Sequence, residues 1–91
     1  MLKIDPKKYN LSSRTVLLKE KNKIVIVINR KSRIIMKDGL NILEKSRSIW
    51  AVDSNISISV ATPAPICSKT REYLNNKKIT FFDFASLNLP S

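Results

Sequence analysis

A loop near the C-terminal end holds the residues of this sequence that are best suited to chemistry. It runs from Thr62 to Lys69 and contains Cys67, the only cysteine of the 91-residue chain. A thiol exposed at the start of a helix, beside Lys69 and Arg71, would have a lowered pKa and react more readily as a nucleophile. In the alternative interpretation, Cys67 packs under the loop as a small apolar residue and keeps a pKa near or above that of free cysteine. We favour the packed thiol, which leaves Cys67 as a weak catalytic candidate.

The second kind of chemistry that the sequence suggests is anion binding. Free N–H groups at the start of a helix after Cys67, together with Ser68 and Lys69, would suit a phosphate. Residues 1–47 carry thirteen Lys and Arg against four Asp and Glu, whereas residues 48–91 carry four against three. Such a one-sided positive field attracts nucleic acid, another polyanion or an acidic protein. The candidate anion-binding residues are Lys19, Lys21, Lys23, Arg30, Lys31, Arg33, Lys37, Ser68 and Lys69.

Several other functions lack the residues that they need. The chain has no histidine and one cysteine, so a structural zinc site and a Ser–His catalytic pair are not expected. Gly39 is the only glycine, which argues against a glycine-rich phosphate loop. No apolar run approaches the length of about 20 residues that spans a bilayer. We therefore expect a non-enzymatic cytoplasmic protein with no metal, no cofactor and no membrane partner.

The elements that must position these residues follow a mixed α/β pattern. Residues 14–84 form the expected domain, between an irregular arm at 1–13 and a tail at 85–91. The expected fold is an N-terminal antiparallel β-ribbon followed by β-α-β-α-β, with two helices packed on a small mixed sheet. The sequence predicts strands at 14–18, 23–29, 33–36, 56–61 and 79–82, and helices at 38–52 and from 66 or 68 to 76.

The segment that begins at Asp38 allows two interpretations. Asp38 can cap a helix that runs to about Val52 and buries Trp50 on its inner face. Alternatively, Asp38 and Gly39 form a tight turn between two strands. Because the helical spacing of apolar residues continues past Leu43, the helix is favoured.

An expected hairpin between residues 23–29 and 33–36 decides where the basic side chains lie. Ligands bind beyond the carboxyl ends of the parallel strands in sheets of this kind. If that hairpin forms, five lysines are expected together at the carboxyl ends of the parallel strands: Lys19, Lys21, Lys23, Lys37 and Lys69. The hairpin tip, with Arg30, Lys31 and Arg33, lies at the opposite edge.

Residues 56–83 resemble the start of the glutaredoxin-type thioredoxin fold, on a strand, Pro65, Cys67, a helix and a second strand. The resemblance implies a redox role for Cys67. Thr70 stands where the second cysteine of the C-x-x-C motif would be. The later strand pair of that fold, with its cis-proline, has no counterpart here.

The closing α-β-α-β segment also resembles restriction-endonuclease-like domains, which often bind nucleic acid. The metal-binding E-x-K motif of that family would fall in the segment 24–30, which contains no carboxylate. Metal-dependent cleavage needs convergent acids, and Glu20, Asp38 and Asp83 are the only candidates.

The leading hypothesis is a small basic binding or accessory domain that contacts nucleic acid or another polyanion through phosphates. We expect phosphate contacts rather than base contacts, because the aromatic residues are not interleaved with basic ones in the sequence. One alternative is an interaction module that docks an acidic protein or pairs with its own copy by a sheet edge. Another is a thiol-dependent redox module that uses Cys67. DNA, RNA and protein remain open as partners, as does the oligomeric state.

Overall fold

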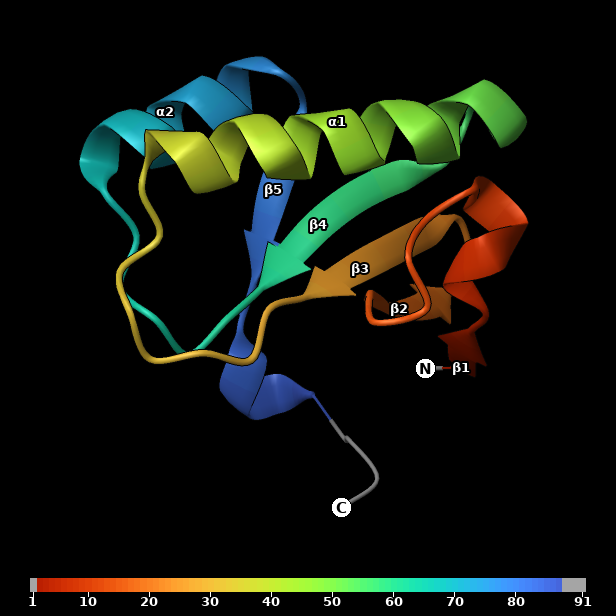
Figure 1. Ribbon diagram of the computed structural model, residues 1–91, viewed down its shortest axis with the longest axis horizontal. Helices are drawn as coiled ribbons and strands as arrows, with labels where there is room; N and C mark the ends of the chain where they lie inside the picture. Colours follow the sequence, from red (N-terminus) through yellow and green to blue (C-terminus); the bar gives the residue numbers. More distant parts are fainter. Residues whose placement is uncertain (1, 88–91) are drawn as a thin grey trace.

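A five-stranded mixed sheet with two helices on one face forms the structure (Figure 1). The computed structural model describes residues 2–87, apart from the side chain of Ser86. The predicted fold class is confirmed: antiparallel strands at the N-terminal end are followed by β-α-β-α-β. The elements are β1 (Leu2–Ile4), η1 (Pro6–Tyr9), β2 (Val16–Glu20), β3 (Lys23–Val27), α1 (Met36–Val52), β4 (Ser57–Ala61), α2 (Ser68–Asn76), β5 (Ile79–Phe82) and η2 (Phe84–Ser86).

The strands lie side by side in chain order, and only β2 runs against its neighbours. β1 and β3 pair antiparallel with β2, whereas β3, β4 and β5 are parallel. α1 and α2 connect the parallel strands and therefore run opposite to them. As a result both helices begin beyond the carboxyl ends of the parallel strands, at the left of Figure 1. This edge thus receives the positive ends of two helix dipoles.

The main core lies between the sheet and its helices. Neighbouring residues of a strand face opposite sides of a sheet, so alternate strand residues point toward the helices. They pack against Ile42 and Ile49 of α1 and Leu74 of α2, all at most 2% exposed. The strand residues on this side are Leu17, Ile24, Ile26, Ile58, Val60 and Ile79.

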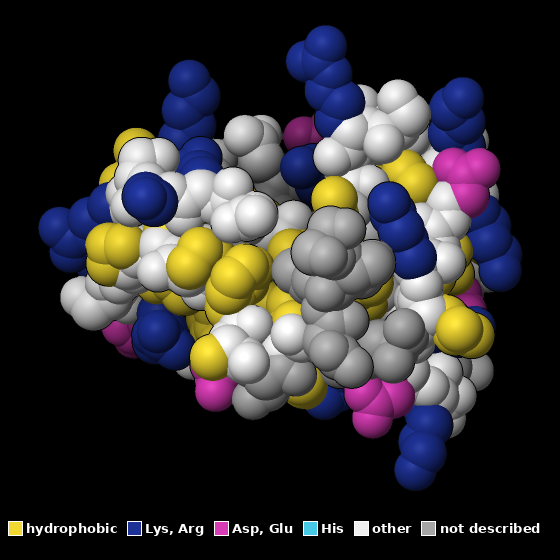
Figure 2. Space-filling view, turned by 90° about the horizontal axis from the view of Figure 1, so that it is seen from below, with side chains coloured by type: hydrophobic (Ala, Val, Ile, Leu, Met, Phe, Trp, Pro, Cys, Tyr) yellow, Lys and Arg dark blue, Asp and Glu magenta, His cyan; other side chains and the backbone are white. Residues whose placement is uncertain are grey.

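The other face of the sheet carries a smaller apolar cluster. It is built on Leu18, Val25, Val27 and Ala61, with Val16, Phe82, Phe84 and Leu87 packed against it. Figure 2 views the molecule from this side and shows hydrophobic side chains near the middle, with most Lys and Arg around the rim. β3 is therefore buried on both faces, as its unbroken apolar run predicts.

The two helices approach each other closely at Gly39. A Cβ atom added there would lie 2.9 Å from Cγ2 of Thr70 in α2, and both residues are buried. Glycine in a helix is unfavourable by about 1 kcal/mol relative to alanine. The missing side chain of Gly39 leaves space for Thr70, which explains why a glycine stands at position 39. The close contact also sets the spacing of α1 and α2.

The expected strand at 33–36 is wrong. β3 pairs with β2 along one side and with β4 along the other, so residues 33–36 cannot pair with β3. Ile34 forms only an isolated parallel bridge with Ile66. The helix begins at Met36, with Asp38 as its third residue, and the alternative tight turn at Asp38 and Gly39 does not form.

Two further expectations need correction. The segment expected to be an irregular arm contains β1, which pairs with β2, and η1, whose Tyr9 is fully buried. The apolar ring of Tyr9 packs into the main core and so docks this segment. Trp50 is half-buried rather than largely buried, because its indole Nε1 reaches the chain past the helix end and donates a hydrogen bond to the Ile56 carbonyl at 2.8 Å.

Candidate anion-binding edge

The loops that follow β3 and β4 are joined to each other through Ile34. Its N–H donates to the carbonyl of Pro65 at 2.9 Å, and its own carbonyl accepts the N–H of Cys67 at 2.9 Å. Ile34 is fully buried between them. The bridge brings the starts of α1 and α2 together. We call the surface formed by residues 28–38 and 62–70 the carboxyl edge.

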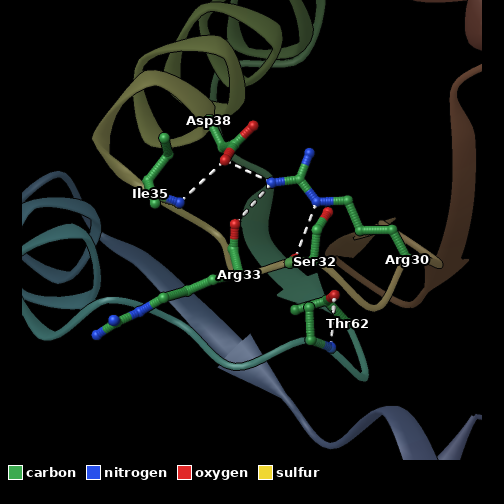
Figure 3. Close-up of polar contacts among 7 residues, drawn as sticks. Arg30, Ser32, Arg33, Ile35, Asp38 and Thr62 are labelled. Atoms are coloured by element: carbon green, nitrogen blue, oxygen red, sulfur yellow. Dashed lines mark hydrogen bonds and ion pairs between the residues drawn. The ribbon is translucent and has the colours of Figure 1, made fainter.

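Arg30 fixes the first of these loops rather than facing a ligand (Figure 3). Its guanidinium donates to the carbonyls of Ser32 and Arg33, at 3.3 and 3.0 Å, and forms an ion pair with Asp38. Asp38 also accepts the N–H of Ile35 at 2.9 Å. The Arg30 hydrogen bond, followed by the Ile35 N–H, lowers the pKa of the Asp38 carboxyl. Arg30 and Asp38 thus clamp the loop onto the first turn of α1.

The remaining cations of the carboxyl edge are exposed. Lys31 and Arg33 lie on the loop after β3, and Figure 3 shows the Arg33 side chain extending away from the Arg30–Asp38 pair. Lys37 and Lys69 each occupy the second position of a helix. Arg30 and Asp38 form the single ion pair between two residues of the described chain. None of these four side chains therefore forms an ion pair with an acid of the segment 2–87.

Cys67 occupies the N-cap position of α2 and is half-buried. Backbone N–H groups of Lys69 and then Thr70 lower the pKa of the thiol, with a smaller contribution from the Arg33 charge. The expectation of a packed thiol with an ordinary or raised pKa is therefore wrong. The reason is that Cys67 directly precedes the first helical residue, Ser68, so its sulfur lies close to the N–H groups of the first turn.

The first turn of α2 is well suited to an anion. Its exposed Ser68 is the first helical residue, and no acidic side chain lies in this turn. The Thr70 hydroxyl is fully buried and has no hydrogen-bond partner of normal geometry among residues 2–87. The N–H groups of Lys69 and Thr70 already act on the Cys67 sulfur, so this turn stabilises negative charge at the start of α2.

The basic residues of the β2–β3 turn lie at the opposite edge of the sheet. Lys19 and Lys21 line a small hollow together with Asp53, and Lys23 begins β3. The sequence predicts these three lysines beside Lys37 and Lys69, which is wrong. The expected strand at 33–36 is the reason for this wrong placement. That strand would make β3 antiparallel to β4, whereas the two strands are in fact parallel. The turn before β3 therefore lies at the opposite edge from the starts of the helices. We call this surface the amino edge, formed by residues 19–23, 53–56 and 77–78.

Aromatic rings and cations are paired in space, which the sequence did not reveal. The guanidinium carbon of Arg71 lies 4.7 Å from the Phe81 ring centre, and Nζ of Lys23 lies 5.3 Å from that of Phe82. These partners are far apart along the chain and meet through the packing of the sheet. A sequence in which aromatic and basic residues are not interleaved thus still brings some of them together in the folded protein.

The acids do not form a nuclease centre in the described structure. Glu20 lies at the end of β2, Asp38 in the first turn of α1 and Asp83 after β5. No three Asp, Glu or Cys side chains of residues 2–87 come together as a metal site. Asp38 is used by Arg30, which leaves it a structural role.

Comparisons with protein-family models, curated protein sequences and solved structures found no match to this chain. Within residues 2–87, neither helix has the length and apolar character needed to cross a membrane.

Proposed function

We propose that this protein is a small non-enzymatic domain that binds nucleic acid, or another polyanion, by contacts to phosphates at the carboxyl edge. The observation that carries the proposal is the convergence of two helix starts with four exposed cations. Lys31, Arg33, Lys37 and Lys69 supply charge, and the starts of α1 and α2 supply the positive ends of two helix dipoles. Phosphate contacts of this kind come from Lys, Arg and helix N-termini in nucleic-acid complexes.

The positions of two lysines support this use. Lys37 and Lys69 stand in the first turns of their helices, where a cation opposes the dipole and is unfavourable by about 0.3–1 kcal/mol. Stability therefore does not account for them. A bound phosphate would reverse the sign of the interaction, since it would be attracted by the lysines and by both helix ends.

The amino edge is a poorer site for an anion. The helices end there, and the negative ends of their dipoles lower the local potential. Lys77 and Lys78 directly follow α2, where a helix C-terminus favours cations for stability alone. Glu20 and Asp53 lie on the same edge. Lys77 and Lys78 thus have a structural explanation that Lys37 and Lys69 lack.

Salt-dependent binding to a short DNA duplex tests the proposal. Each phosphate contact contributes about 0.9 to the slope of log K against log salt. The double variant Arg33→Gln, Lys69→Gln should therefore reduce the slope by about 1.8. The matched variant Lys21→Gln, Lys78→Gln removes the same charge from the amino edge and should leave the slope nearly unchanged. Equal losses for both variants, or an affinity that ignores salt, would contradict the proposal.

Two alternatives are distinguished by related measurements. An acidic protein partner would use the same cations. This alternative would be favoured if polyglutamate displaced bound DNA when both are present at the same concentration of negative charges. A thiol-dependent function is favoured by the lowered pKa of Cys67. Since the chain has no second cysteine, such a function would need a thiol from another molecule. Turnover of a disulfide substrate that is lost in Cys67→Ser would support it.

A further inference from the structure

A cavity of about 460 Å³ opens where β4 and β5 end. Its walls come from the loop after β4, from the end of β5 with η2, and from Arg71 of α2. Ligands bind beyond the carboxyl ends of parallel strands, and ligand pockets typically measure about 300–1,000 Å³. The cavity has the place and the size of a ligand site. It also adjoins the carboxyl edge, because the loop after β4 belongs to both.

The lining of this cavity combines aromatic rings with one planar cation. Phe81, Phe82 and Phe84 are each half-buried, so part of every ring remains accessible. The Arg71 guanidinium lies over Phe81, and Arg71 is exposed. Unstacked nucleobases bind proteins by stacking on aromatic rings and on guanidinium planes. This set of side chains suits a flat aromatic group.

The cavity has little net charge, which suits a neutral occupant better than a phosphate. Arg71 and Asp83 line it with opposite charges, and the Asp83 carboxylate accepts the N–H of Ala85 at 3.1 Å. The Thr62 hydroxyl oxygen accepts the N–H of Ala64 at 3.2 Å and keeps its own proton to donate. A hydroxyl donor of this kind can pair with an acceptor on the edge of a base. Phosphates are better placed at the neighbouring carboxyl edge.

We propose that the cavity holds one unstacked base of a single-stranded nucleic acid whose phosphates lie along the carboxyl edge. The inference rests on the proposed function and narrows its ligand from polyanions in general to single strands. A base inside a duplex is stacked and paired, and must be extruded at a cost before it can enter a pocket. The domain therefore binds single strands, or unpaired ends, more tightly than duplexes of the same phosphate number.

Three ligands with nearly the same number of phosphates test the pocket: a twenty-nucleotide DNA strand, a ten-base-pair duplex and an abasic twenty-nucleotide strand. The normal strand should bind more tightly than the duplex, whose bases are stacked and paired. One stacked base is worth about 5- to 150-fold in affinity. The wild-type protein should bind the normal strand that much more tightly than the abasic strand. Arg71→Lys keeps the charge but loses the plane, and should abolish most of this ratio while leaving abasic binding unchanged. The matched variant Arg47→Lys, on the exposed side of α1, should change neither value.

Each contrary outcome identifies what has failed. Equal affinity for the normal and abasic strands would overturn the base pocket and leave phosphate binding at the carboxyl edge intact. A second contrary outcome is that Arg71→Lys weakens binding of the abasic strand as much as binding of the normal strand. That result would also overturn the base pocket, because Arg71 would then contact the sugar-phosphate backbone rather than the base. Failure of all three ligands to bind would overturn the proposed function together with the pocket.

Discussion

The contact between Gly39 and Thr70 makes a sharp prediction, because it fixes how the starts of α1 and α2 lie relative to each other. An added Cβ at position 39 would lie 2.9 Å from Cγ2 of Thr70, whereas optimal carbon–carbon contacts are about 3.5–4.0 Å. Both residues are buried, and a threonine side chain on a helix is restricted to two rotamers. Gly39→Ala must therefore separate the helices or displace Thr70.

The expected magnitude follows from two opposing effects. Overpacking costs about 1–3 kcal/mol, and the better helix propensity of alanine returns about 1 kcal/mol. Gly39→Ala should thus lower the free energy of unfolding by about 0–2 kcal/mol. Thr70→Ser removes the crowded methyl group and keeps the hydroxyl, at a cost of about 1 kcal/mol. In the double variant the alanine methyl occupies the vacated space, so its stability should return close to that of the wild type.

Urea denaturation of the four proteins measures this cycle. We expect a favourable coupling energy of at least about 1 kcal/mol between the two substitutions. Additive effects would refute the reasoning, because they would mean that the two side chains do not compete for the same space. Stabilisation by Gly39→Ala alone, by the full helix-propensity gain, would show that the close approach is absent.

The remaining predictions concern Asp38 and Cys67. Asp38→Ala should lower the free energy of unfolding by about 1–3 kcal/mol, because Arg30 and the Ile35 N–H both lose their acceptor; the exposed Glu44→Ala on the same helix should stay within about 0.5 kcal/mol of the wild type. Since the pKa of Asp38 is lowered from 3.8 in the folded protein, its contribution is present above that pH and is lost as the pH falls through the folded value. Denaturation curves should therefore show the difference between wild type and Asp38→Ala shrinking below pH 3.8, and a difference that grows there would be inconsistent with the lowered pKa. The alkylation rate of Cys67 should titrate with a midpoint below the ordinary value of 9.0, and Cys67→Ser should be nearly neutral because serine is a good N-cap. A midpoint at or above 9.0 would restore the packed-thiol interpretation.

The sequence predicts most elements because their patterns are long or unbroken. The apolar spacing from Ile42 to Ile49 identifies α1, and the β-branched run of β3 identifies a strand buried on both faces. The segment 34–36 is also apolar but only three residues long, and such a short run does not distinguish a strand from the entry to a helix. β1 has the same length, and its alternation of Leu2, Lys3 and Ile4 is too short to identify a strand. Its place is decided by pairing with β2.

One local error had a large effect on the predicted site. The extra strand at 33–36 reversed the direction of β3 and exchanged the two edges, so Arg33 was separated from Lys37 and Lys69. The Arg30–Asp38 ion pair was also missed, although an arginine eight residues before an acid at a helix start is compatible with it. The contact of Arg71 with Phe81 depends on how α2 packs on β5. No local sequence signal reports a contact of this kind.

Backbone amide chemical shifts, followed by NMR during titration with a short single-stranded oligonucleotide at low salt, test the central claim most directly. The account predicts that the largest changes fall on the carboxyl edge, at Arg33, Ser68, Lys69 and Thr70, and that they weaken as salt is added. The amides of the β2–β3 turn should change little. Changes centred on Lys21 and Lys23, or no localised change at saturating oligonucleotide, would contradict a phosphate-binding carboxyl edge.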